Sequence, residues 1–232
     1  MKGKTAIFGC RKKVRYTEDQ WKLLEEKRKI AADIMKILAD SGIDSLVYGS
    51  VARGDVKKTS DVDIFIPSAI PSYRIELALH DHTILEKKIV QATPNYAIKG
   101  EIVLENANVS FPLVKMKDKE LDFYRFGGCM DLESLMRKKR VAGVDKRLVL
   151  IIPLRDGHYE IPANELDVSE LAEYLDIGIE IVMERFRVLE RRREIGRTGV
   201  FLSEAVHEFE SFETKLKEII DRNPFVKRRI MF

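Results

Sequence analysis

Apolar positions in the first half of the chain predict a long helix followed by several short strands. Apolar side chains recur three and four positions apart over residues 17–41, and Gly42 follows, which predicts a helix that ends there. Thr17 and Gln20 are typical of a capping box at its start. Short apolar or alternating runs then predict strands over residues 43–48, 62–66, 96–104 and 109–115. We expect the helix to pack on the sheet that these strands form.

The pattern after residue 115 predicts mainly helices, with one hairpin. Asp131 is a candidate N-cap for a helix over residues 132–139. Residues 147–154 and 159–161 predict two strands joined by a turn at residues 156–157. Helices are also predicted over residues 202–220 and, with poorer periodicity, over residues 73–91.

Residues 167–202 resemble a winged helix-turn-helix domain. Leu171, Leu175, Val182 and Phe186 follow the apolar pattern of two helices joined by a tight turn, and residues 194–200 fit a wing. The turn carries Asp176 where glycine is usual, although aspartate tolerates left-handed geometry. The resemblance implies a surface for DNA or RNA. Five arginines are candidates for nucleic-acid contact: Arg187, Arg191, Arg192, Arg193 and Arg197. The alternative is a solvated face of interleaved charges.

The most specific motif lies between residues 48 and 63. Gly49-Ser50 follows the first apolar run, and Asp61-Val62-Asp63 begins the second one ten residues later. A glycine turn into a helix presents backbone N–H groups to an anion. Side chains two apart in a strand point the same way, so Asp61 and Asp63 form a pair of carboxylates that a hard divalent cation would stabilise.

This motif resembles that of the nucleotidyltransferase superfamily, which includes DNA polymerase beta, the CCA-adding enzymes and the minimal nucleotidyltransferases. The resemblance covers roughly residues 40–126 and implies that a nucleoside triphosphate binds at Gly49, Ser50 and Arg53. It further implies two Mg²⁺ ions, with Mn²⁺ as the alternative, held by Asp61, Asp63 and a third acid on a later strand. Asp122, between Leu121 and Phe123, is the candidate for that acid, and Asp131 is its rival. Arg53 has a second interpretation as a surface arginine.

The fold expected from this resemblance is α+β. A nucleotidyltransferase catalytic domain with a mixed β-sheet and flanking helices is predicted over residues 1–130. A mainly helical domain, with a winged helix as one interpretation, is predicted over residues 131–232.

Composition further limits the classes of protein to which the chain could belong. The 232 residues carry a net charge of +3 with 34% charged side chains, which excludes a strongly basic protein and leaves only local basic patches. Cys10 and Cys129 are far apart and lack the spacing of metal ligands, so free thiols are expected. The chain has no apolar run of transmembrane length and no signal-peptide core, so we expect a cytoplasmic protein without a membrane partner.

Two functions follow from the sequence. The first is a Mg²⁺-dependent enzyme that transfers a nucleoside monophosphate from a triphosphate to a hydroxyl of RNA, protein or a small molecule. The second is a DNA-binding regulator whose nucleotidyltransferase-like domain binds nucleotide without turnover. The pair of acids and the candidate third acid favour the enzyme. The oligomeric state, the base and the acceptor stay open.

Overall fold

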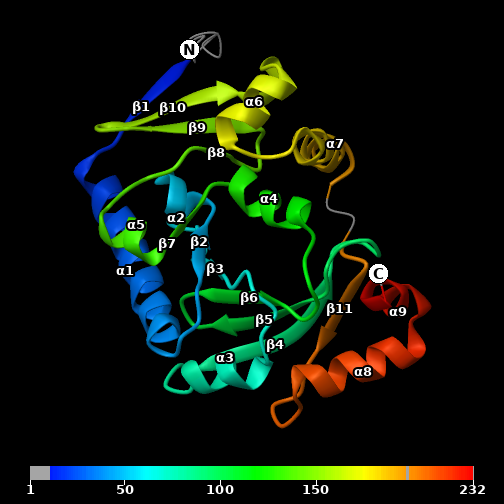
Figure 1. Cartoon of the computed structure of the whole chain (residues 1–232). Coiled ribbons are helices and arrows are strands. Elements are labelled where there is room, and N and C mark those ends of the chain that lie inside the picture. The colour runs from blue at the N-terminus through cyan, green and yellow to red at the C-terminus, as the bar shows by residue number, and fades with distance from the viewer. Residues whose placement is uncertain (1–10, 197–198, 232) are drawn as a thin grey trace.

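The computed structural model describes residues 11–196 and 199–231, and its two sheets lie one above the other in Figure 1. The strands are β1 (Lys12–Arg15), β2 (Leu46–Tyr48), β3 (Asp63–Phe65), β4 (Ile84–Gln91), β5 (Lys99–Leu104), β6 (Asn108–Pro112), β7 (Cys129–Asp131), β8 (Gly143–Val144), β9 (Val149–Leu154), β10 (Gly157–Pro162) and β11 (Leu202–Ala205). The helices are α1 (Glu18–Asp40), α2 (Ser50–Arg53), α3 (Ser72–Ala78), α4 (Asp118–Phe126), α5 (Leu132–Met136), the 3₁₀ turn η1 (Ala163–Glu165), α6 (Val168–Leu175), α7 (Ile179–Ile195), α8 (Phe212–Arg222) and α9 (Pro224–Met231).

The large sheet is mixed, as predicted. Its strand order is β11-β4-β5-β6-β3-β2-β7, and β3 and β6 run parallel while the other neighbours are antiparallel. In the centre of this sheet Asp63 pairs with Tyr48 of β2 on one side and with Asn108 of β6 on the other. The strand β3, which carries Asp63 of the motif, therefore lies in the centre of the sheet.

The two faces of the large sheet have different partners. Alternation along β3 places Ile64 on the opposite face from Asp63 and Phe65. Phe65 stacks on Tyr124 of α4, with ring centroids 3.6 Å apart. The long helix α1 contacts β3, α2, α3 and α5, and its buried residues join the main core. Thr17 caps α1 by accepting a hydrogen bond from the Gln20 N–H, as predicted. The α4 face is therefore the one that carries the acidic side chain.

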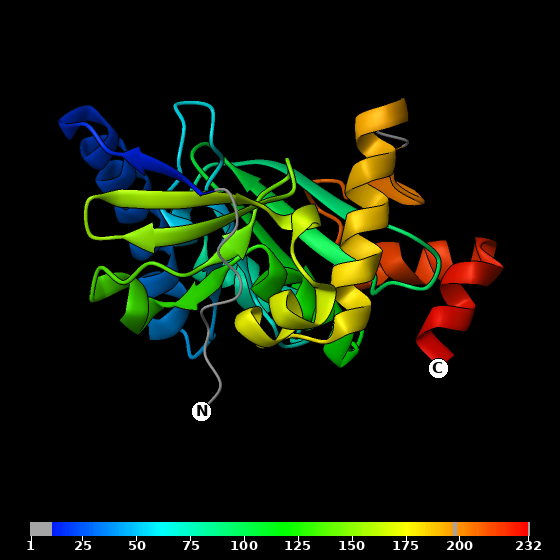
Figure 2. The ribbon, with the colours of Figure 1, turned by 90° about the horizontal axis from the view of Figure 1, so that it is seen from above.

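A small antiparallel sheet lies above α4 in Figure 1. Its order is β1-β10-β9-β8, and a second apolar core joins it to α6, α7 and α4. Figure 2, seen from above, shows α7 standing beside this sheet. The hairpin of β9 and β10 confirms the predicted pair of strands. The N-terminal strand β1 reaches it from the far end of the sequence.

Two predicted helices are wrong in part. Residues 73–91 form the short helix α3 and then β4, and residues 202–220 form β11 and then α8. Part of each segment forms a strand of the large sheet. These two strands, β4 and β11, pair with each other. Short apolar runs fit both periods, and only the presence of a strand partner decides between them. The predicted helix that begins after Asp131 is confirmed as α5, with Asp131 capping it.

The two sheets do not follow the predicted boundary between residues 130 and 131. The strand β7 spans it, β1 joins the small sheet, and β11 returns to the large sheet. The helices α8 and α9 contribute Phe212, Ile219 and Val226 to the main core. The chain after residue 200 is thus part of the same core as α1.

The predicted helix-turn-helix exists as a pair of helices, but its predicted wing does not appear among the described residues. The helices α6 and α7 contact each other, and Asp176 takes the left-handed conformation at φ 54°. Residues 194–195 end α7, and residues 202–205 pair with β4. Arg197 lies outside the described residues, as does Cys10.

Two further features complete the fold. In the described part of the chain, no helix combines the length and apolar character needed to cross a lipid bilayer. Cys129 in β7 is a free, half-buried thiol, and burial raises its pKa to about 11.

Gly100 of β5 is required by close packing, and its substitution tests the core. A Cβ atom at Gly100 would lie 2.4 Å from the ring of Phe111, which is fully buried in the main core. We expect Gly100→Ala to lower the free energy of unfolding by about 1–3 kcal/mol through overpacking. Urea denaturation measures this loss. Adding Phe111→Leu should recover part of it, and a double variant less stable than both single variants would contradict the packing explanation.

Candidate active site

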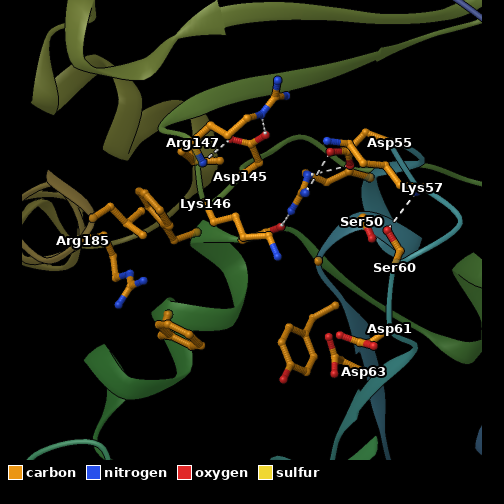
Figure 3. Close-up of a pocket in the computed structure, with 18 of the residues that line it drawn as sticks. Ser50, Asp55, Lys57, Ser60, Asp61, Asp63, Asp145, Lys146, Arg147 and Arg185 are labelled. Atoms are coloured by element: carbon orange, nitrogen blue, oxygen red, sulfur yellow. Dashed lines mark hydrogen bonds and ion pairs between the residues drawn. The ribbon is translucent and has the colours of Figure 1, made fainter. Parts of the chain in front are cut away.

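A cavity of about 410 Å³ lies where the large sheet, the small sheet and α7 meet. Its residues come from the turn into α2, the loop before β3, the end of α4, the loop between β8 and β9, and α7. Figure 3 shows this cavity with its charged residues. Segments far apart in sequence therefore provide a single charged site.

The Gly49-Ser50 turn forms one wall of the cavity. Gly49 adopts φ 75° and ψ −142°, a conformation that favours glycine, and its N–H donates to the Gly128 carbonyl at 2.8 Å. Ser50 is the first residue of the four-residue helix α2 and lines the cavity. Both residues predicted to bind nucleotide at this turn are thus at the cavity.

Asp61 and Asp63 lie side by side on the floor of the cavity (Figure 3). Asp61 is exposed and Asp63 is half-buried. Burial, and secondarily the charge of Asp61, raise the pKa of Asp63. A hydrogen bond from the Asn108 side-chain amide, at 3.3 Å, and the charge of Lys146 act in the opposite direction. The ionised pair is therefore strained in the absence of a cation.

The structure does not bring Asp122 to this pair. Asp122 lies on the helix α4 and not on a strand, so that part of the prediction is wrong. Its carboxylate accepts a hydrogen bond from the Gly178 N–H at 3.0 Å and pairs with Arg125 at 3.4 Å. Among the described residues, no cluster of three His, Cys, Asp or Glu side chains could hold a metal. Asp122 has an apolar residue on each side. This local pattern occurs in strands and also in amphipathic helices such as the nine-residue α4, so it does not distinguish them.

The strand beside Asp63 carries an amide where the family resemblance implies an acid. Asn108 of β6 is the register partner of Asp63, and the next strand, β5, carries Glu101. The charge of Glu101 contributes to the raised pKa of Asp63, after burial and the charge of Asp61. Asp131, the rival candidate, is used instead as the N-cap of α5.

Cationic side chains without internal partners face the same cavity. Lys57, Lys146 and Arg185 line it, and within residues 11–196 and 199–231 their side-chain nitrogens make no hydrogen bond or ion pair. Arg185 lies over the ring of Phe123, with its guanidinium carbon 4.8 Å from the ring centroid. Burial, followed by the charge of Arg192, lowers the pKa of Arg185. Unpaired cations next to a carboxylate pair suit a polyanion that binds with a metal ion.

Arg53 is mainly a structural residue. Its guanidinium forks onto the two oxygens of Asp55 at 3.0 and 3.1 Å and also donates to the Gly127 carbonyl. The side chain is only 7% exposed. The guanidinium predicted to bind the nucleotide is therefore already engaged by Asp55, although Arg53 does line the cavity.

The cavity wall formed by the loop between β8 and β9 was not predictable from the sequence. Asp145 accepts hydrogen bonds from the Arg147 and Val149 N–H groups and from the Arg147 side chain, which fixes this loop. Lys146, between them, is left to face the cavity (Figure 3). These residues match no motif, and only the tertiary fold brings them to Asp63.

The arginines predicted to contact nucleic acid have different surroundings. Arg187 and Arg193 are exposed on α7. Arg192 lines the cavity, and Arg191 lines a neighbouring one. Arg197 is outside the described residues. The described arginines therefore do not all lie at one site.

Comparison with protein families finds one match, to the nucleotidyltransferase domain, over residues 24–122. The matched region begins in α1 and ends in α4, and it includes Gly49, Ser50, Asp61 and Asp63. No curated protein matches the chain. The match therefore supports assigning residues 24–122 to the nucleotidyltransferase superfamily.

Proposed function

We propose that the protein is a Mg²⁺-dependent enzyme that transfers a nucleoside monophosphate from a nucleoside triphosphate to an acceptor hydroxyl. The observation that carries this proposal is the single cavity in which Asp61 and Asp63 face unpaired cations. A carboxylate pair alone would suit a cation, and a cationic wall alone would suit an anion. The two together suit a metal-bound triphosphate.

The residues present fit Mg²⁺ when the triphosphate is part of the site. Mg²⁺ in nucleotide enzymes is usually held by one or two carboxylates together with phosphate oxygens and water. Asp61 and Asp63 supply two carboxylates, and the raised pKa of Asp63, caused by burial and by Asp61, indicates that a cation would favour their ionised forms. The predicted second ion has less support, because Asp122 lies elsewhere and Asn108 is beside Asp63. Bound Mg²⁺ would neutralise charge on the phosphates and polarise the reacting phosphorus.

Each side chain then has a definite task. Asp61 and Asp63 would hold Mg²⁺, which would keep the reacting phosphate next to the sheet. Lys57, Lys146 and the Ser50 hydroxyl bind the β- and γ-phosphates, which leave as pyrophosphate. The acceptor oxygen forms a new bond to the α-phosphorus, the bond from that phosphorus to the bridging oxygen breaks, and the hydroxyl proton passes to water. Positioning and charge stabilisation supply most of the catalysis in such a transfer.

Label transfer tests the proposal directly. Purified protein is incubated with Mg²⁺, each α-labelled nucleoside triphosphate in turn, and separate pools of RNA, protein and small metabolites. Labelled product together with pyrophosphate release, both dependent on Mg²⁺, is the expected result. Binding of triphosphate with no transfer to any pool would contradict the enzymatic proposal and favour a nucleotide-binding regulator.

Lys146 is expected to act on binding of the triphosphate. We predict that Lys146→Met raises the KM for the triphosphate about tenfold or more, because a charge-assisted hydrogen bond is worth about 1.5–3 kcal/mol. Steady-state kinetics with pyrophosphate as the measured product checks this. Lys36→Met, at an exposed position of α1, is the matched control. An unchanged KM would show that the triphosphate does not reach the loop between β8 and β9.

A further inference from the structure

A second cavity, of about 240 Å³, adjoins the first one. Phe123, Arg185 and Arg192 line both cavities. Its other walls come from β5, the segment before it, α4, α7 and the residues that follow α7. A molecule in this cavity would therefore lie next to whatever occupies the space around Asp61 and Asp63.

Apolar and aromatic side chains form much of the second cavity. Met116, Val188 and Ala97 line it, and Phe123 and Tyr124 contribute rings at 90° to each other with centroids 5.1 Å apart. Such walls suit the flat or apolar body of a small molecule.

Arg185 marks the junction between the cavities. Its Nε atom is buried without a hydrogen-bond partner, and no ion pair to its guanidinium occurs among the described residues. A buried guanidinium normally pairs with a carboxylate or phosphate, because leaving its donors unsatisfied is costly. Glu184, the neighbouring acid, instead accepts a hydrogen bond from the Tyr96 hydroxyl. Arg185 is thus left available to an anion that is not part of the chain.

Lys99 provides a second cation inside the same cavity. Its ammonium contacts the Tyr124 hydroxyl at 3.2 Å, and no carboxylate pairs with it among the described residues. Burial lowers the pKa of Lys99. Glu120, whose carboxylate also lines this cavity, forms an ion pair with Arg229 at 3.0 Å. Lys99 and Arg185 are therefore two cationic side chains of this cavity that form no ion pair among the described residues.

We infer that the second cavity binds the acceptor of the transfer, and that this acceptor is a small molecule with an anionic group, phosphate or carboxylate, on an apolar or aromatic body. This inference rests on the proposed function, because the acceptor is defined by that reaction. The anionic group pairs with Lys99 and Arg185. The acceptor hydroxyl then faces the first cavity, forms its bond to the α-phosphorus as pyrophosphate leaves, and loses its proton to water.

The dimensions and charge of the cavity favour this class of acceptor. A space of about 240 Å³ holds a small molecule and not a folded macromolecule. Lys99, Arg185, Arg191 and Arg192 outnumber the two carboxylates in its lining, Glu120 and Glu184, so a polycationic acceptor would be repelled.

Calorimetric titration with phenyl phosphate tests the inference, with phenol as its uncharged counterpart. The titration is made with the full chain and Mg²⁺, saturated with the α,β-methylene analogue of the triphosphate that the protein prefers. We expect phenyl phosphate to bind without displacing the analogue, and phenol to bind at least about tenfold more weakly. Lys99→Met should weaken phenyl phosphate about tenfold or more and leave the affinity for the analogue unchanged. Lys36→Met is the matched control.

Three outcomes would overturn the inference. Mutual displacement of phenyl phosphate and the analogue would place both in the first cavity. A base-dependent loss of analogue affinity in Lys99→Met would assign the second cavity to the nucleobase. Phenyl phosphate affinity that Lys99→Met leaves unchanged would remove the cavity from acceptor binding. By contrast, failure of the analogue itself to bind in a Mg²⁺-dependent way would refute the proposed function and not this inference alone.

Discussion

Replacing Asp63 by asparagine is expected to lower the rate of nucleotidyl transfer at least about a thousandfold, because the proposed Mg²⁺ site would lose one of its two carboxylates and with it several kcal/mol of charge stabilisation. The side chain is half-buried, and its backbone is paired with Tyr48 and Asn108 in the centre of the sheet, so the strands fix its position. Transfer of label from an α-labelled triphosphate measures the loss. Asp33→Asn, at an exposed position of α1, is the control for the substitution itself.

The same substitution is expected to stabilise the metal-free protein. The raised pKa, caused first by burial, means that the folded chain binds the Asp63 proton more tightly than the unfolded chain does. The free energy of unfolding therefore falls as pH rises from the ordinary carboxyl pKa through the raised one, and the ionised form retains the whole cost above that range. Asp63→Asn removes this cost at neutral pH and should raise the Tm in EDTA. Mg²⁺ with a triphosphate should raise the Tm of the wild type more than that of the variant.

The variant Asp122→Asn tests whether Asp122, the predicted third acid, takes part in the proposed metal site. We expect this variant to retain transfer within about tenfold of the wild type, because Asp122 contacts the start of α7 through the Gly178 N–H, pairs with Arg125 of its own helix, and asparagine keeps an acceptor oxygen. A loss as large as that of Asp63→Asn would show that Asp122 joins the metal site when substrate binds. A variant of Asp63 that keeps near-normal transfer would exclude the carboxylate pair as the metal site.

Glu120→Ala is expected to have the largest effect on stability, a loss of about 3–5 kcal/mol, because it leaves a buried cation without its partner. Glu120 is 1% exposed and accepts hydrogen bonds from the Ala97 and Lys117 N–H groups as well as from Arg229. Through these bonds it joins β5's leading segment, the start of α4 and the last helix, α9. Urea denaturation measures the loss, and Glu105→Ala, at an exposed position, is the control.

Arg229→Met should cost less than Glu120→Ala. The carboxylate would keep its two backbone donors, whereas the guanidinium in Glu120→Ala keeps only the Lys115 carbonyl, at 3.2 Å. In the double variant the two losses should not add, because each single change already breaks the ion pair. Additive losses would mean that the pair contributes no coupling energy and that the cost arises from packing alone.

Local patterns were sufficient for the core of the site. Gly49-Ser50 and Asp61-Val62-Asp63 lie within fifteen residues of each other, and the glycine turn and the strand that position them depend on nearby residues. Their place at one cavity follows from the pairing of β2 with β3. The mixed sheet and the capped helix α1 were predictable for the same reason.

Long-range pairing explains what the sequence could not predict. The residues of β11 fit a helical pattern, and the strand β4 with which they pair lies more than a hundred residues earlier in the chain. Lys146 and Arg185 reach the cavity only through the packing of the small sheet and α7 on α4. Asp122 fitted the expected third acid by its apolar neighbours, which a helix and a strand can share.

The pairing of β1 with β10 has a consequence for how the chain is made. The Tyr16 hydroxyl meets His158 at 2.7 Å across 142 residues of sequence. At a synthesis rate of about 5–20 residues per second, β10 therefore leaves the ribosome on the order of ten seconds or more after β1. In that interval an unpaired strand edge is exposed next to the nascent nucleotidyltransferase domain, and β1 carries Lys12, Lys13 and Arg15, charges that discourage pairing with another chain. We expect the basic side chains of β1 to disfavour pairing with another chain until β10 has been synthesised.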